Sequence, residues 1–356
     1  MKVSTRMTQS LLLQAFQGTN TTIPVWFMRQ AGRYLPQYQA LRKKYSLKEM
    51  FRHPEIAATV TVLPVKELKV DAAILFADIL TLPSAMGFDI RFDKDNGPLV
   101  KNPLTKPSDV EAIHDFADLS YIREIVALVN QRLPEDIPLI GFAGSPFSVA
   151  CYLLEGAAPL WGPSALGFNK ALHFIERETV AFHKLMRVLT QNTIRYLHLQ
   201  KDAGIKVFQI FDTWAGLLRP ADYARWVFPY VQEIFQGVDL PSIYYVKNSH
   251  PLLAFMERSG ADFLSVCQSV VLGHNPLLEK TDKGIQGNLF NGLLYADNKT
   301  LEKEIRDVLM GVRHYKRYVF NLSHGVLPDA AVDTLKFIVD HVHEFDWMRK
   351  DDRVKI

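Results

Sequence analysis

Two arginines near the N-terminus have a spacing that could bind an anion. The apolar run Pro24–Met28 ends at Arg29, and Arg33 follows four residues later. Gly32 and Pro36 prevent a long regular element directly after the run. Both guanidinium groups therefore lie where a predicted buried strand turns, and each planar fork can hold a carboxylate or phosphate through two hydrogen bonds. The alternative, a pair of solvated surface arginines, does not account for the apolar lead-in.

Polar residues also follow other short apolar runs of the chain. Because the ends of parallel strands meet at one edge of a sheet, we expect the side chains there to converge. Tyr152 lies about two turns into a helix that Ser145 opens. The residues at predicted strand ends are Arg29, Asp78, Thr213, Lys247 and His324. Converging Arg, Asp, Lys and His side chains suit a multiply anionic ligand that also carries hydrogen-bond donors.

Each of these residues also has a structural alternative. Asp78 and Thr213 could cap the helices that follow them. Tyr152 could pack in the core with a hydrogen-bonded hydroxyl group. Ser145 precedes a proline and is expected to be a structural N-cap. His324 lies in a turn directly after a buried strand, and this position favours a side chain that faces a ligand.

The elements that must position these residues alternate between strands and helices. Eight short apolar, β-rich runs occur, and most are continuously hydrophobic, as strands buried on both faces are. They are Pro24–Met28, Ala72–Ala77, Pro138–Phe142, Lys206–Phe211, Ser242–Val246, Asp262–Val266, Gly284–Leu289 and Arg317–Leu322. Helical patterns separate them, at His53–Leu68, Asp109–Leu133 with a break near Asp118–Ser120, Phe168–Gln200, Pro220–Gly237, Pro251–Ser259, Lys299–Gly311 and Asp329–Trp347.

Eight such units predict an α/β fold, a (β/α)8 TIM barrel that forms a single domain over residues 1–356. Two segments fall outside the repeat. The run Leu11–Leu13 predicts an N-terminal surface helix, and Phe88–Phe92 with Leu99–Val100 predicts an inserted hairpin over one barrel end. The alternative, an open doubly wound sheet with a second domain, would have a glycine-rich phosphate loop after its first strand, and this sequence has none.

Composition narrows the class of protein further. The chain has 356 residues, of which 48% are hydrophobic and 22% charged, with a net charge of +3. Clustered basic residues for nucleic acid and an apolar run of membrane-spanning length are both absent from the sequence. Cys151 and Cys267 are far apart, which favours a reduced, cytoplasmic protein. Neither H-x-C nor C-x-x-C spacing occurs, so we expect no metal site.

Five segments carry a resemblance to a known family. In chain order they are FMRQAGRYLP, DAAILFADIL, GFAGSPFSVACYLLEG, FDTWAG and NLSHGVLPD. They resemble the motifs of the uroporphyrinogen decarboxylases in order and spacing, over nearly the whole chain. The resemblance implies a barrel enzyme that acts as a homodimer without metal or organic cofactor. Such a carboxy-lyase removes carbon dioxide from the four acetate groups of uroporphyrinogen and gives coproporphyrinogen in haem biosynthesis.

The resemblance also implies roles for individual residues. Asp78 would bind the pyrrole N–H groups and stabilise the cationic ring that takes up the electrons left by carbon dioxide. Arg29 would hold the reacting acetate and pass a proton through a water, since arginine itself is a poor acid with a pKa above about 12. The expected substrate-binding residues are Arg29, Arg33, Asp78, Tyr152, Thr213 and His324.

Three segments depart from the family pattern. Ser265–Gln268 replaces Gly-Leu-Asp-Trp, Phe290–Asn291 replaces Asp-Pro, and Asn248 stands where glycine is common. Because of these changes, the family pattern does not determine the shape of the pocket. They motivate one alternative, a protein that binds a porphyrinogen without turnover. A second alternative is a corrinoid-linked methyltransferase with zinc on an H-x-C pair, but Val246-Lys247-Asn248 occupies the place of that pair.

Overall fold

The computed structural model describes residues 10–93, 97–157 and 167–346, and in these ranges seven parallel strands form one curved sheet. Neighbouring strands follow the chain, so each strand pairs with the next one in sequence. The strands are β1 (Ala73–Ile74), β4 (Leu139–Gly144), β5 (Val207–Asp212), β6 (Ser242–Val246), β7 (Phe263–Ser265), β8 (Gly284–Gln286) and β9 (Tyr318–Val319). All residues of β4 and β6 are buried, as the continuous apolar runs predicted.

The predicted first strand closes the sheet into a ring. Val25 forms a parallel bridge with Phe320, whose backbone N–H donates to the Pro24 carbonyl at 2.9 Å. On its other side, Val25 accepts from the Asp71 backbone N–H at 2.8 Å. The Asp71 carboxylate takes the Val25 N–H at 2.7 Å, so a side chain replaces part of the ladder and this strand is reduced to a bridge. The predicted barrel is therefore confirmed, with its eighth strand reduced to the bridge at Val25.

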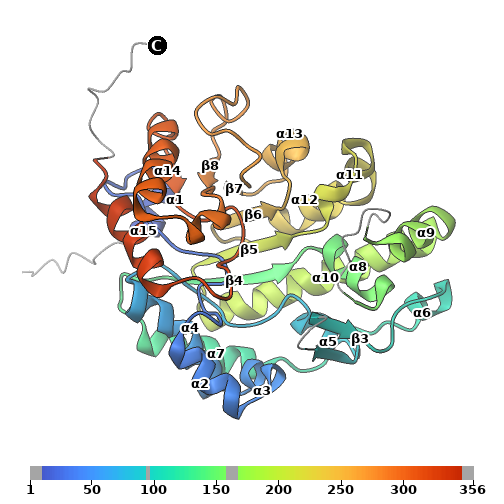
Figure 1. Ribbon diagram of the computed structural model, residues 1–356. Coiled ribbons are helices and arrows are strands. Elements are labelled where there is room, and N and C mark those ends of the chain that lie inside the picture. The colour runs from blue at the N-terminus through green and yellow to red at the C-terminus, as the bar shows by residue number, and fades with distance from the viewer. Residues whose placement is uncertain (1–9, 94–96, 158–166, 347–356) are drawn as a thin grey trace, which may run out of the picture.

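Helices form an outer layer around the strands (Figure 1). Their apolar faces pack inward, while the strands fill the centre. The helices are α1 (Leu11–Gln17), α2 (Pro36–Lys44), α3 (Leu47–Arg52), α4 (Pro54–Leu68), α5 (Thr81–Ala85), α6 (Pro107–Glu111), α7 (Ser120–Arg132), α8 (Pro146–Glu155), α9 (Asn169–Arg177), α10 (Thr179–Ala203), α11 (Pro220–Trp226), α12 (Phe228–Gly237), α13 (Leu253–Glu257), α14 (Asn298–Gly311) and α15 (Val332–Glu344), with short 3-10 turns η1 (Ala215–Leu217), η2 (His250–Leu252) and η3 (Asn291–Tyr295).

The helix boundaries differ from the sequence prediction at several points. The single pattern predicted over Phe168–Gln200 is two helices that meet at Glu178, and the one over Pro220–Gly237 is interrupted at Val227. The sequence pattern missed α2, α3 and α5, which are short. The predicted end of the last helix, Trp347, lies outside the described residues. Within the ranges given above, none of the helices has the length and apolar character that a bilayer crossing requires.

Both predicted additions to the barrel are present. Strands β2 (Ile90–Asp93) and β3 (Gly97–Val100) form the antiparallel hairpin, which lies beside α5 in Figure 1. The Val100 N–H donates to the carbonyl of Gly156 at 2.8 Å, so the hairpin is attached to the end of α8. The predicted N-terminal helix is α1, which buries one face and exposes the other. Leu12 is fully buried, because α1 packs against the end of the barrel.

The last helix is connected to the ring closure by an ion pair. His343 on α15 places Nε2 at 2.8 Å from Asp71 Oδ2, the same oxygen that accepts the Val25 N–H. The hydrogen bond to Asp71 raises the pKa of His343 above its ordinary value of 6.5. The protonated imidazole is therefore favoured in the folded state.

This pair predicts a stability that depends on pH. A histidine whose pKa is raised by folding contributes stability that is complete below the unfolded pKa and is lost as the pH rises through the folded pKa. His343→Gln should therefore lower the free energy of unfolding by about 1 kcal/mol at pH 5.5 and by less at pH 8.5. Urea denaturation at both pH values measures the difference. His341→Gln is the matched control, since that ring bonds the Phe337 carbonyl, and an equal loss at both pH values for the His343 variant would contradict the prediction.

Candidate active site

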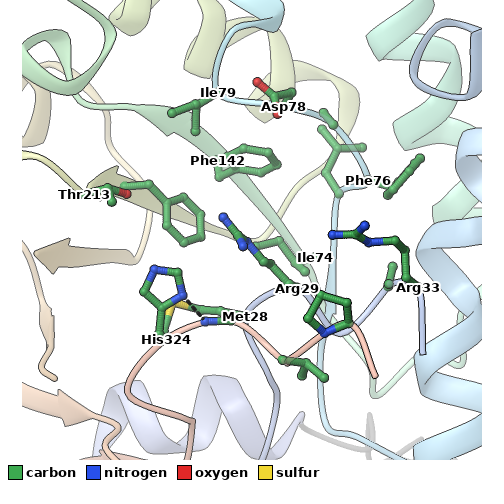
Figure 2. Close-up of a pocket in the computed structure, with 18 of the residues that line it drawn as sticks. Met28, Arg29, Arg33, Ile74, Phe76, Asp78, Ile79, Phe142, Thr213 and His324 are labelled. Carbon is green, nitrogen blue, oxygen red and sulfur yellow. Dashed lines mark hydrogen bonds between the residues drawn. The ribbon is translucent and has the colours of Figure 1, made fainter. Parts of the chain in front are cut away.

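One cavity of about 590 Å³ opens where the barrel strands end. All six residues that the sequence singled out as site residues line it: Arg29, Arg33, Asp78, Tyr152, Thr213 and His324. Figure 2 shows both guanidinium groups extending into the space below Asp78, with His324 on the other side of Arg29. Apolar side chains such as Phe142 and Phe211 form much of the remaining wall, and Pro98 of the hairpin reaches the mouth. The cavity therefore combines charged groups with an aromatic lining.

Arg29 lies in a tight turn directly after the ring-closing strand. Its φ of 59° is in the left-handed region, and the Gln30 N–H donates to the Phe27 carbonyl at 3.0 Å. Gly325 leaves the room for its side chain, because a Cβ atom there would lie 2.4 Å from Arg29 Cδ. The predicted break in the strand is confirmed, and its result is to turn the Arg29 guanidinium into the cavity.

Two buried amides that the sequence analysis missed hold this turn. Gln30 donates to the Ala72 carbonyl at 2.9 Å and accepts from the Phe27 N–H at 3.0 Å. Asn321 accepts from the Met28 N–H at 3.1 Å. The sequence did contain a signal for both residues, since each is a polar residue at the end of an apolar strand. The segments around Arg29 and His324, about 295 positions apart, are thus joined side by side in the ring.

Asp78 is half-buried, and one of its oxygens is used by the chain itself. Its Oδ1 accepts the Leu80 N–H at 2.8 Å, in the turn before α5. The N-cap position of α5 is Leu80, so the alternative that Asp78 caps this helix is wrong, although the side chain does stabilise the approach to it. Burial raises the pKa of Asp78 above its ordinary value, while the Leu80 hydrogen bond and the Arg29 charge oppose the rise. Oδ2 can accept hydrogen bonds from a ligand.

His324 is a neutral donor at physiological pH. Burial lowers its pKa to about 3, and the positive charges of Arg29 and Lys247 act in the same direction. Nδ1 accepts the Gly325 N–H at 2.6 Å, the contact dashed in Figure 2. The ring proton is therefore on Nε2, and this N–H is suited to a carboxylate oxygen in the cavity.

Tyr152 and Thr213 are held by a buried polar network between α8 and β5. Burial raises the pKa of Tyr152 to about 12, so its hydroxyl group stays protonated, and its ring packs edge-on against Trp214. One turn earlier on α8, the Ser148 hydroxyl donates to the Asp212 carboxylate at 2.6 Å and accepts the Trp214 backbone N–H at 3.1 Å. This network fixes the loop that carries Thr213. Tyr152 is thus a wall residue of the cavity, not a core residue alone.

Two further residues from the sequence analysis, Ser145 and Lys247, directly follow the strands β4 and β6. Ser145 occupies the N-cap of α8, but its side chain makes no capping hydrogen bond. Lys247 was expected among the converging strand-end side chains, without a specific role, and it does line the cavity. Burial lowers the pKa of Lys247, and the Arg29 charge adds to this effect.

The departures from the family pattern lie mostly outside the cavity wall. Asn248 has a φ of 56°, a conformation that asparagine tolerates better than most residues, which accounts for glycine being common there. The described residues that line the cavity include neither Ser265–Gln268 nor Phe290–Asn291. Cys267 is buried, and Phe290 is half exposed. Within the described ranges, no three His, Cys, Asp or Glu side chains cluster closely enough to hold a metal ion.

Comparison with known sequences identifies the family. Residues 7–345 match the family described as uroporphyrinogen decarboxylase (URO-D). The chain belongs to the uroporphyrinogen decarboxylase family. The uroporphyrinogen decarboxylase of Thermodesulfovibrio yellowstonii is 42% identical over 340 residues, which cover 94% of this chain and 98% of that protein. The uroporphyrinogen decarboxylase of Thermus thermophilus is 38% identical over 346 residues, which cover 95% and 98% of the two chains.

Solved structures show that the fold of this uroporphyrinogen decarboxylase family member is shared more widely. A methyltransferase from Methanosarcina mazei aligns with a TM-score of 0.78 at 20% identity, covering 95% of this chain and 99% of that chain. A B12-independent methionine synthase from Shewanella aligns with a TM-score of 0.55 at 10% identity, covering 83% and 88%. At these identities the likeness concerns the barrel and not the chemistry.

The raised pKa of Asp78 predicts a stabilising substitution. Burial makes the charged carboxylate less favourable in the folded state than in the unfolded state, so the folded protein carries the cost of burying that charge. Asp78→Asn should therefore raise the free energy of unfolding by roughly 1 kcal/mol at pH 7. The gain should shrink as the pH falls through the raised pKa, because the wild-type group then becomes neutral.

Urea denaturation at pH 7 and pH 4.5 measures this effect. Asp118→Asn is the matched control, since hydrogen bonds from Ser120 lower the pKa of that exposed carboxylate and its removal should give no gain. A loss of stability in the Asp78 variant at pH 7 would show that the carboxylate is held favourably in its charged form.

Proposed function

We propose that this protein removes carbon dioxide from the four acetate side chains of uroporphyrinogen and so produces coproporphyrinogen for haem biosynthesis. The observation that carries the proposal is the shared cavity of Asp78, Arg29 and Arg33, with a carboxylate opposite two guanidinium groups. The substrate is a macrocycle with eight carboxylates at its rim and four N–H groups at its centre. Membership of the uroporphyrinogen decarboxylase family supports the same reaction.

In the proposed mechanism, Asp78 serves the centre of the macrocycle. Its carboxylate accepts hydrogen bonds from the pyrrole N–H groups and stabilises the positive ring that forms when a pyrrole is protonated. The carbon–carbon bond to the acetate carboxyl group then breaks, and its electron pair moves into the cationic ring. Because the substrate itself provides this electron sink, the chain has to bind, orient, stabilise charge and supply one proton to the carbon that loses carbon dioxide.

The remaining site residues hold carboxylates in this proposal. Arg29 holds the acetate that reacts, and Arg33 holds a second carboxylate by two parallel hydrogen bonds. The neutral His324 donates from Nε2, while Tyr152 and Thr213 donate from their hydroxyl groups. These donors fix the acetate in one orientation before the bond breaks, which reduces the entropy lost on reaching the transition state.

We extend the proposal to the setting of the enzyme. We expect residues 1–356 to form one barrel domain that works in the cytoplasm as a homodimer. Its binding partner besides the second subunit is the small-molecule substrate. The absence of clustered basic residues argues against nucleic acid as a partner, and the two distant cysteines suit a reducing compartment. The mass of the protein in solution, measured by light scattering after size-exclusion chromatography, tests the dimer.

Turnover separates this proposal from a protein that only binds the substrate. The purified chain should convert uroporphyrinogen under anaerobic, reducing conditions through seven-, six- and five-carboxylate intermediates to the four-carboxylate product. Chromatography of the oxidised porphyrins counts the carboxylates. Recovery of the eight-carboxylate compound alone, together with measurable binding, would replace the proposed enzyme by a binding protein.

Asp78→Asn should nearly abolish turnover while the fold persists. The amide cannot balance a developing positive ring, and loss of a group that stabilises transition-state charge costs about 10²–10³ in kcat. Product formation measures the loss, and circular dichroism checks the fold. Asp89→Asn is the control and should keep full activity, since this partly exposed carboxylate precedes β2, pairs with Arg91 and does not line the cavity. Unchanged turnover in the Asp78 variant would refute its role.

Gly325→Ala should reduce turnover by displacing Arg29. The new Cβ would lie 2.4 Å from Arg29 Cδ, so the guanidinium must move, and a misplacement of about 1 Å can cost about 10²-fold. The double variant with Arg29→Ala should be no worse than Arg29→Ala alone, because the shortened side chain leaves room for the methyl group. Additive losses would show that Gly325 acts through another contact.

A further inference from the structure

Lys247 lies on the cavity wall beside His324. It follows β6 directly, and successive strand residues alternate between faces, so Lys247 and Tyr245 point the same way into the barrel. The Tyr245 ring lies edge-on to His324 at 6.2 Å between centroids, and its hydroxyl group donates to the Ser323 carbonyl at 3.3 Å. The lysine therefore lies one step further along the strand whose Tyr245 contacts His324, in the cavity that Arg29 also lines.

The main chain around Lys247 is held firmly from two neighbouring strands. Gly216, in η1 after β5, packs so closely that a Cβ atom there would lie 1.6 Å from the Lys247 carbonyl oxygen. Asn248 then turns the chain through its left-handed conformation. Ser249 is buried and accepts the Cys267 backbone N–H at 3.2 Å, after β7. The lysine thus projects from a fixed point of the rim and not from a mobile loop.

The proposed reaction needs one proton for every acetate. An acetate side chain plus one proton gives a methyl group plus carbon dioxide, and the new C–H bond forms on the carbon that has lost the carboxyl group. Most groups of the described cavity wall are unsuited to supply it. Arginine does not give up its proton in proteins, Tyr152 has a pKa of about 12, and His324 is neutral with a pKa of about 3. Asp78 accepts from the pyrroles.

Lys247 differs from these groups in both charge and environment. Its ammonium is half-buried, and burial together with the Arg29 charge lowers its pKa, while Cys267 opposes this effect. The groups that face it from the packed elements are Arg29, Cys267, His324 and Tyr245. A lowered pKa makes the ammonium a better proton donor than an exposed lysine, and the position on the cavity wall lets it recover a proton from solvent, as a general acid must.

We propose that Lys247 is a catalytic residue that first helps Arg29 to hold the reacting carboxylate and then protonates the carbon from which carbon dioxide leaves. This inference rests on the proposed function. It makes Lys247, and not a water beside Arg29, the donor of the proton. As the carbon–carbon bond breaks, its electron pair forms a double bond between the ring and the side-chain carbon. That carbon takes a proton from the ammonium, the N–H bond breaks, and the ring carbon then returns its own proton to solvent.

Two substitutions and a pH profile test the inference. Lys247→Arg keeps a cation for the carboxylate but cannot act as the acid, so kcat should fall by about 10²–10⁴ while KM stays within about threefold of wild type. Lys247→Gln should lower kcat similarly and also raise KM. In the wild type, kcat should decline as the pH rises and Lys247 loses its proton, and this alkaline limb should be absent from the Lys247→Arg variant.

The controls separate this inference from the proposed function. Lys303→Arg, on the exposed surface of α14, should keep wild-type kcat and KM, and thermal unfolding checks that each variant is folded. Wild-type kcat in Lys247→Arg with a raised KM in Lys247→Gln would make the lysine an anchor only and overturn the inference. An alkaline limb that is unchanged in Lys247→Arg would also overturn it. Failure of the wild type to release carbon dioxide would overturn the proposed function, and this inference with it.

Discussion

The closure of the ring by a few residues of the N-terminal segment is the constraint on which the cavity depends. Val25 pairs with Phe320 on one side and with Asp71 on the other, and little regular ladder supports it. Buried amides replace the missing strand hydrogen bonds, because unpaired backbone groups in the core would be costly. The turn that follows carries Arg29 over Gly325. The same contacts that complete the barrel thus place a cation in the cavity.

Charge in an apolar cavity explains the protonation states along its wall. Arg29 and Lys247 make a positive side, and their charges combine with burial to keep His324 neutral. The same burial raises the pKa of Asp78 on the opposite side. A site of this kind carries unbalanced charge until a ligand of many carboxylates and a donor-rich centre enters. The buried charges lower the stability of the folded protein, and they also prepare the cavity for a charged ligand.

The sequence predicted what depends on local pattern. The strands were recognisable because burial on both faces makes each a continuous apolar run. Five of the six site residues follow such runs, and the sixth, Tyr152, lies within the helix after one. Long-range contacts left no local pattern. The pairing of Met28 with Asn321 joins residues 293 positions apart, and nothing near Glu178 announces the break between α9 and α10. The closely packed Gly325 was visible only as a turn residue.

The order in which the chain is made gives the ring closure one more consequence. The Val25 segment leaves the ribosome early, whereas its partner Phe320 emerges only after some 295 further residues have been translated. Throughout that interval an apolar arm, with Trp26 and Phe27 in it, lacks its neighbour on one edge. The ring cannot close, and Arg29 cannot take its place beside Gly325, until that last segment has been made.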